Sequence, residues 1–211
     1  MKLKYLLIGG LGLMLAGGTL AVSSYKLGGH KNLIWENGPK LMDMAQDVQI
    51  IPPSEKIDKI VIHANHQQVQ ITRGLDFEIQ TSYEKQDKPL VSIKEQTLTI
   101  EGNARDRDVL VSLEDNTPSI TLTIPKDLSF SEIELEGDNS YFGLFDLSTE
   151  KLSMKTYGGT ISLDNFKGKS AKIDDKQGNM MINHSAIQKL SMTGRNTRLY
   201  FRRVNKYTRY T

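Results

Sequence analysis

The second half of the chain repeats its apolar residues every 19 positions, starting near Ser131. Five columns of four residues, spaced 19 apart, hold nineteen apolar residues in twenty positions, where the average content of 38% would give about eight. The columns are Ile133, Leu152, Ala171 and Leu190; Leu135, Met154, Ile173 and Met192; Phe142, Ile161, Met180 and Leu199; Leu144, Leu163, Ile182 and Phe201; and Leu147, Phe166, Ser185 and Val204. Only Ser185 is polar, and Ile187 two residues later can point the same way.

Within each repeat the apolar residues alternate with polar ones, which is the spacing of a β-strand with one buried face. Each repeat therefore predicts two short strands joined by polar corners. A period near 20 that contains two strands is typical of a β-solenoid, in which stacked rungs bury one another's apolar faces. We predict an all-β, β-helix-like fold of two-strand rungs of about 19 residues, preceded by one N-terminal transmembrane helix. The outward residues Glu136, Lys155 and Asp174 then form a column of alternating charge.

The segment YGGTISLDNF places Gly158 and Gly159 directly before an alternating strand, and Gly178 repeats the second glycine one period later. A phosphate-binding loop needs a helix after its glycines, whereas ISLDNF is strand-like. Because glycine permits the positive φ of a tight corner, we expect these glycines to turn the chain between the two strands of a rung.

The rest of the chain divides around this repeat. From Lys59 onward the alternation is strand-like but less regular, which leaves two possibilities: earlier rungs, or an antiparallel lead-in to the same domain. Residues 38–49 could form a short helix. We therefore expect a membrane anchor or signal peptide at 1–25, a stem or linker at 26–58, a β-repeat domain at 59–204 and a basic tail at 205–211.

The N-terminal segment from Tyr5 to Tyr25 contains no charged residue and follows Lys2 and Lys4. About 20 apolar residues suffice for a helix to cross a bilayer, and the lysines favour a cytoplasmic N-terminus with the following chain outside. The anchor residues would be Tyr5, Leu6, Leu7, Ile8, Leu11, Leu13, Met14, Leu15, Leu20 and Val22. The alternative is a signal peptide cleaved near Ala21-Val22-Ser23. Trp35 could sit at the membrane interface or cap the first rung.

Charge is distributed unevenly along the chain. The net charge is +2, but eight basic and no acidic residues follow Asp175, so the preceding part carries −6. The candidate anion-binding residues are Arg195, Arg198, Arg202, Arg203, Lys206 and Arg209. On an exported chain their ligand would be an anionic wall polymer or lipid head group and not nucleic acid. Alternatively, these residues bind no ligand and form only the charged last rung that covers the end of a solenoid, followed by a frayed tail.

Other candidate chemistry is sparse. The chain has no cysteine, which removes disulfides and a thiol nucleophile. A weak polar-edge candidate combines Asp146, Asp164, Asn165, Asn183 and His184, which stacking would bring together at one edge. These side chains could bind a cation or a sugar hydroxyl, but Asn and Asp more often cap corners. In the segment HANH, strand alternation would separate His63 from His66, so we expect no metal or other cofactor there.

Several segments make the chain similar to a bacterial family called "putative adhesin", a domain of unknown function built from β-strand repeats. These segments are LGGHKNLIWENG, KEQTLTIEGN and ITLTIPKDLSFSEIELEGDN, and the resemblance covers residues 27–204. At the corners, the family's aspartate is replaced by Tyr141, Thr160, Asn179 and Arg198, so calcium held by stacked aspartates is not expected. The resemblance implies a β-helix-like fold and a membrane-tethered, extracytoplasmic location.

Taken together, these patterns predict a non-enzymatic module of the bacterial cell envelope, anchored in the cell membrane by a single helix. Its role would be adhesin-like binding or structural, with an anionic wall polymer or another envelope protein as partner. Two alternatives stay open. One is a polysaccharide-active β-helix enzyme that uses the polar edge. The other is a regulatory partner of a membrane protein, with helix pairing through Gly12 and Ala16.

Overall fold

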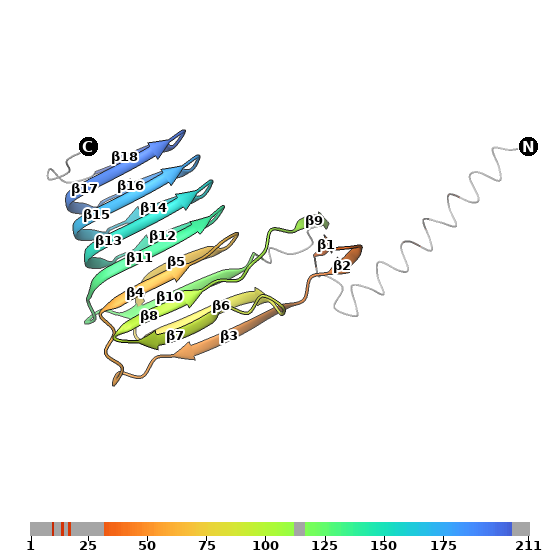
Figure 1. Cartoon of the computed structure of the whole chain (residues 1–211), viewed down its shortest axis with the longest axis horizontal. Coiled ribbons are helices and arrows are strands. Elements are labelled where there is room, and N and C mark those ends of the chain that lie inside the picture. Colours follow the sequence, from red (N-terminus) through yellow and green to blue (C-terminus); the bar gives the residue numbers. More distant parts are fainter. Residues whose placement is uncertain (1–9, 11–13, 15–16, 18–31, 112–116, 204–211) are drawn as a thin grey trace, which may run out of the picture. The chain divides into compact units, whose positions relative to one another are not determined.

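The computed structural model describes residues 10, 14, 17, 32–111 and 117–203, in which all the elements are β-strands (Figure 1). The predicted N-terminal helix, apart from three single residues, lies outside this part of the chain. No helix within the described residues is long and apolar enough to span a bilayer. The chain divides into two compact units, residues 1–43 with 107–116 and residues 44–106 with 117–211.

The first unit contains a three-stranded antiparallel sheet in the order β2-β1-β9. Its strands are β1 (Leu33–Trp35), β2 (Pro39–Leu41) and β9 (Asp108–Val111). Strands β1 and β2 form a hairpin whose turn contains Asn37 and Gly38, both at positive φ. The ladder continues past β2, because the Met42 amide donates to the Asn32 carbonyl at 2.8 Å.

The second unit consists of two sheets that share one apolar core. The eight-stranded sheet has the order β18-β16-β14-β12-β5-β10-β6-β3, and the seven-stranded sheet has the order β17-β15-β13-β11-β4-β8-β7. The strands of the first are β18 (Arg198–Arg202), β16 (Asn179–Asn183), β14 (Thr160–Asp164), β12 (Tyr141–Phe145), β5 (Gln68–Gly74), β10 (Ser119–Pro125), β6 (Glu78–Glu84) and β3 (Met44–Ile50). Those of the second are β17 (Ala186–Arg195), β15 (Lys167–Lys176), β13 (Ser148–Tyr157), β11 (Phe130–Asp138), β4 (Lys59–His63), β8 (Thr97–Glu101) and β7 (Leu90–Lys94).

Four consecutive rungs stack in the 19-residue register that the sequence predicts. Each rung has one strand in each sheet, and the rungs are β11–β12, β13–β14, β15–β16 and β17–β18. In one sheet Leu152 pairs with Ala171, and in the other Ile161 pairs with Met180. All these pairings are parallel, so equivalent residues of successive rungs lie one above another, about 4.8 Å apart. Figure 1 shows this ladder.

The inward columns form the core. Leu163 and Ile182 are direct register partners and both are fully buried. Ser185, the polar exception, is also buried, and it is satisfied because its hydroxyl accepts from the Phe166 amide and donates to the Asn183 carbonyl. Ile187 is buried too and supplies apolar surface near that position, as expected. The predicted alternation of inward and outward residues is therefore confirmed for the rungs β11–β12, β13–β14 and β15–β16.

The middle of the chain contains both an earlier rung and an antiparallel section, the two arrangements that the sequence left open. Strands β4 and β5 form a further rung on β11 and β12, with Ile60 opposite Ile133 and Val69 opposite Phe142. Beyond that rung, β8 and β10 also run parallel to it, whereas β7, β6 and β3 pair antiparallel. The prediction of a short helix over residues 38–49 is wrong. This segment forms β2 and β3, and β3 is held by a ladder to β6.

The corners use left-handed residues at repeated positions. At the first corner of each rung these are Asn139, Gly158, Gln177 and Asn196, with φ between 49° and 71°. At the second corner they are Asp146, Asn165, His184 and Arg203, with φ between 48° and 57°. Each corner also bonds to the next, as when the Gly158 amide donates to the Lys176 carbonyl at 2.7 Å. The backbone ladder thus continues around the turns.

The adjacent glycines Gly158 and Gly159, at the corner between β13 and β14, have different roles. Gly158 has φ +71°, as expected, but Gly159 and Gly178 lie outside the left-handed region, so this part of the prediction is wrong for them. A Cβ on Gly159 would lie 2.3 Å from the Ser140 carbonyl oxygen. Gly159 is therefore required for the close approach of two backbones, whereas the position of Gly158 requires only a residue that tolerates a positive φ.

This difference gives a matched pair of substitutions. Gly158→Asn should change the free energy of unfolding by less than about 1 kcal/mol, because asparagine tolerates this φ and stands at the equivalent Asn139 and Asn196. Gly159→Ala should cost roughly 2 kcal/mol or more, because a backbone atom must move. Urea denaturation followed by circular dichroism measures both. Equal costs would show that the second glycine is not required for space.

Candidate binding surface

The C-terminal end of the stack carries the basic residues that the sequence singles out. Arg195 ends β17, Arg198 and Arg202 bound β18, and Arg203 follows at the second corner. All four are exposed. Lys206 and Arg209 lie outside the described residues. We define the basic end as Arg195, Arg198, Arg202 and Arg203 together with Lys176 and Lys189, which the sequence analysis did not select as binding residues.

Several outward lysines of the earlier rungs form ion pairs with glutamates. Lys59 lies 2.8 Å from Glu134 and 3.4 Å from Glu132, while Lys151 lies 2.6 Å from Glu132. The hydrogen bond from Lys151 is the main cause that lowers the pKa of Glu132, and the bond to Glu134 raises the pKa of Lys59. A glutamate row on β11 is therefore matched by lysines on the strands at either side.

The predicted column of Glu136, Lys155 and Asp174 is also stabilised by pairing of opposite charges on neighbouring strands. Lys155 lies 2.5 Å from Glu136, and this hydrogen bond is the largest cause raising the pKa of Lys155, with Asp174 contributing through its charge. The register places Lys155 between Glu136 and Asp174. The expected stacking of alternating charges is confirmed.

The basic end lacks such partners. Within the described part of the chain, none of its six residues makes an ion pair. The register instead places like charges together, since Lys176 pairs with Arg195. Arg198 and Arg202 lie four residues apart on one face of β18, about 13 Å at 3.3 Å per residue. This surface therefore presents several positive charges along its length.

Apolar side chains accompany these charges. Leu199 and Phe201 occupy inward columns, yet they are 46% and 40% exposed, because β18 is the edge strand of its sheet. Tyr200 points outward between Arg198 and Arg202 and is also exposed. Within the described residues, the surface thus presents arginine and an aromatic ring on the last strand of its sheet.

The weak polar-edge candidate is brought together as expected. The Asn165 amide nitrogen donates to Asp146 Oδ1 at 2.6 Å, and His184 Nδ1 lies 3.3 Å from Asp164 Oδ1. Asp146, Asn165 and His184 are the left-handed residues of successive second corners, and Asn183 directly precedes the last of them. These residues therefore form the second corners and link neighbouring corners to one another. Among the described residues no three His, Asp or Glu side chains come close enough to hold a metal ion.

The segment HANH holds its histidines apart. His63 Nδ1 lies 3.0 Å from Glu101, whereas His66 occupies a left-handed corner position and its Nδ1 is 3.9 Å from Asp106. Each histidine thus has a separate carboxylate neighbour.

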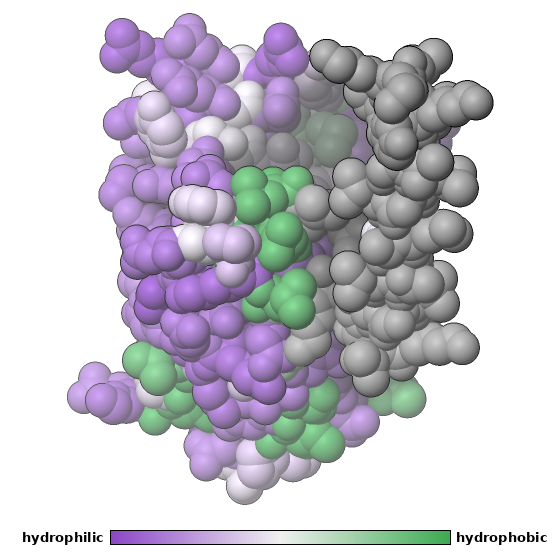
Figure 2. All heavy atoms as spheres, turned by 90° about the vertical axis from the view of Figure 1, so that its right-hand side faces the viewer, coloured by the Kyte–Doolittle hydropathy of each residue, from purple (hydrophilic) through white to green (hydrophobic). Residues whose placement is uncertain are grey.

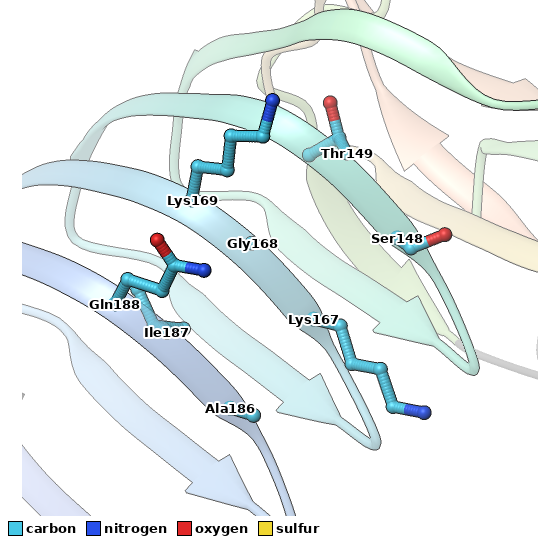
Figure 3. A pocket seen from close by; sticks show the side chains of 8 residues that line it. All are labelled: Ser148, Thr149, Lys167, Gly168, Lys169, Ala186, Ile187 and Gln188. Atoms are coloured by element: carbon cyan, nitrogen blue, oxygen red, sulfur yellow. The ribbon is translucent and has the colours of Figure 1, made fainter. Parts of the chain in front are cut away.

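A hollow of about 390 Å³ opens where β13, β15 and β17 begin (Figure 3). Gly168 lies between Thr149 and Ile187 in the register and has no side chain to fill the space. Lys169 at its rim is paired with Glu150, while Lys167 points away from the strands on the other side. The hollow therefore has one apolar wall and no catalytic pair of side chains among its lining residues.

Asp175 is a residue whose role the sequence did not predict. Its side chain is 1% exposed, and its carboxylate accepts from the hydroxyls of Thr156 at 2.6 Å and Thr197 at 2.7 Å. Thr156 lies in the rung before and Thr197 in the rung after, so the carboxylate links three rungs beside the first corners. The adjacent Asp174 points outward, as strand alternation requires.

A family model and one solved structure with a TM-score above 0.5 agree with this fold. A model of the Toastrack DUF4097 family matches residues 57–199. No curated protein matches the chain. A crystal structure described as a "putative cell adhesion protein" from Clostridium sporogenes superposes with a TM-score of 0.54 at 11% identity, covering 77% of this chain and all of that one.

Two further solved structures, each described as a "putative adhesin", are more distant. The one from Bacteroides fragilis has a TM-score of 0.37 at 12% identity and covers 80% of this chain and 97% of its own. The one from Parabacteroides merdae has a TM-score of 0.29 at 10% identity, with 80% and 95% covered. The family match spans more than half of the sequence and includes all but the last residues of the rungs. The chain belongs to the Toastrack DUF4097 family.

Proposed function

We propose that this protein is a non-enzymatic, membrane-tethered module of the bacterial envelope, whose β-solenoid holds a basic end against an anionic envelope polymer. The observation that carries the proposal is the contrast in charge pairing along the stack. Lys59, Lys151, Lys155 and Lys169 of the earlier rungs are paired with glutamates, and Lys167 and Lys172 are not paired with any of the described residues. Within the described chain, none of the six residues of the basic end has such a partner.

The arrangement suits a polymer better than a small molecule. Arg198 and Arg202 are separated by about 13 Å along one strand, and Arg195 with Lys176 adds positive charge at the first corner. A chain of regularly spaced phosphates or carboxylates meets several of these cations at once, so weak contacts add up. Tyr200, exposed between the two arginines, offers a flat surface to a sugar ring.

The location rests on the N-terminal sequence. An uncharged segment from Tyr5 to Tyr25 that follows two lysines favours a signal anchor with the remaining chain outside the cytoplasm. The solved structure from Clostridium sporogenes, described as a "putative cell adhesion protein", supports a binding role for the fold in general. The non-enzymatic reading is supported by the polar edge, whose side chains are engaged in corner contacts.

The anionic contact predicts a local charge effect. Replacing Arg198 and Arg202 together by Gln should weaken binding of the full chain to purified anionic wall polymer by about tenfold at low salt, because two unpaired cations are lost. The matched control replaces Lys151 and Lys155 by Gln. It makes the same change in formal charge at lysines already paired with Glu132 and Glu136, and should alter affinity by less than about twofold.

Binding is measured by sedimentation with the polymer at low and high salt. An affinity that does not fall with salt, or an equal loss in both double variants, would reject a localised basic surface in favour of non-specific attraction.

The tether predicts a defined proteolysis pattern. Protease added to intact cells should degrade the β-repeat domain and leave an N-terminal fragment in the membrane fraction, detectable with an epitope tag placed before Lys2. A domain that resists protease until the cells are lysed would contradict the external location. Degradation with no membrane fragment would favour the cleaved signal peptide instead.

A further inference from the structure

The hairpin of the first unit has an apolar face that the structure leaves open. Leu33 pairs with Leu41 and Trp35 pairs with Pro39, so these four side chains project from the same side of the β1–β2 ladder. Trp35 is 53% exposed and Leu41 is 60% exposed, and Pro39 is exposed as well. We call this surface the hairpin face.

The opposite side of the hairpin is different. Ile34, which alternates with Leu33 and Trp35 along β1, is only 3% exposed. On that side only Ile34 is buried, since its register partners Lys40 and Val109 are exposed. The two sides therefore differ mainly in that the hairpin face carries the larger apolar residues. Figure 2 shows one face of the molecule, on which apolar groups lie in the middle and along the lower part of a mainly hydrophilic surface.

The position of the hairpin in the sequence places it close to the predicted membrane helix. Six residues, 26–31, separate the uncharged segment ending at Tyr25 from Asn32. Seven Cα steps reach at most about 24 Å even when fully extended. If Tyr25 lies at the outer end of a membrane helix, the hairpin is confined to the layer next to the lipid head groups, where tethering raises its effective concentration.

The chemistry of the face fits that layer. Tryptophan is enriched at membrane interfaces because its ring is apolar and its N–H is polar, and Leu33, Pro39 and Leu41 add apolar surface around it. Asp108 lies opposite Trp35 on β9, and Lys40 is paired with Glu36 at 3.1 Å. Asp108 therefore projects from the same side as Trp35, at the β9 edge of the face, where the head-group layer still contains water. Lys40 is the register partner of Ile34 and projects from the other side.

We propose that the hairpin face docks in the head-group region of the bilayer that anchors the chain, so that Trp35 is an interfacial contact and not only a stem residue. This inference rests on the proposed membrane tether. It makes the anchor a two-point attachment, helix plus hairpin, and so limits the orientations that the first unit can adopt at the membrane surface.

Trp35 is the only tryptophan of the chain, so its fluorescence reports this contact alone. The full chain is reconstituted in phosphatidylcholine–phosphatidylglycerol vesicles, with lipids brominated at shallow acyl carbons in both leaflets. Trp35 emission should fall by more than about half relative to unbrominated vesicles, and it should resist quenching by acrylamide in water.

Variants on the two sides of the same sheet show which side contacts the lipid. Leu41→Ser, on the hairpin face, should remove most of the quenching by brominated lipid. Val109→Ser is the control, since Val109 is 52% exposed but pairs with Ile34 on the other side, and it should leave the quenching unchanged. Equal loss in both variants would overturn the assignment of the docking side.

Flotation of the vesicles at high salt separates the two proposals. A chain that floats while Trp35 is quenched by acrylamide and not by brominated lipid keeps its tether and overturns the docking. A Trp35 shielded from both quenchers is covered by protein, which also overturns it. A chain that does not float with the vesicles contradicts the tether itself, and the docking inference fails with it.

Discussion

In-register stacking of parallel strands is the constraint on which the rest of this structure depends. A rung of 19 residues has two short strands and cannot bury its own apolar face. When rungs stack without a register shift, each inward side chain meets its equivalent in the next rung, as Leu163 meets Ile182. A fully buried leucine side chain contributes roughly 1.5–3 kcal/mol, so the inward columns supply the main driving force. Any shift by one residue would turn these columns toward water.

The same constraint explains the corners and the outward charges. A fixed repeat length requires each corner to take the same path, which is why left-handed residues recur at Asn139, Gly158, Gln177 and Asn196. It also aligns outward residues in columns, so that Lys155 falls beside Glu136 and Asp175 falls beside Thr156. At the last described rung the columns end, and this leaves Leu199 and Phe201 partly exposed and the arginines around them unpaired within the described chain.

Much of this architecture follows from the sequence, because inward positions of four rungs are apolar at a constant spacing. The rung formed by β4 and β5 could not be found in that way. It stacks on β11 and β12, but 55 residues, 75–129, lie between β5 and β11 in the chain. The error over residues 38–49 has another cause. Leu41, Ala45 and Val48 follow helical spacing, yet β3 lies at a sheet edge, where the ladder to β6 decides the backbone conformation and burial does not.

The candidate surface was partly predictable for similar reasons. Arg195, Arg198 and Arg202 occupy outward strand positions, so their exposure follows from strand alternation. The burial of Asp175 depends on Thr197 in the following corner, a contact that no periodic pattern specifies. The open hairpin face also required the structure, because only the register of β1 and β2 places Leu33, Trp35, Pro39 and Leu41 on one side.

The stacking account can be tested most directly by deleting part of the repeat in the middle of a strand. Removal of the 19 residues 172–190 joins Ala171 to Ser191 and restores the pairing of Met154 with an inward Met192. Removal of the 18 residues 172–189 shifts Met192 to the outward side. If stacking in register determines the fold, the first variant keeps a β-rich circular dichroism spectrum and unfolds cooperatively, whereas the second loses several kcal/mol of stability or fails to fold. Equal stability of the two variants would contradict it.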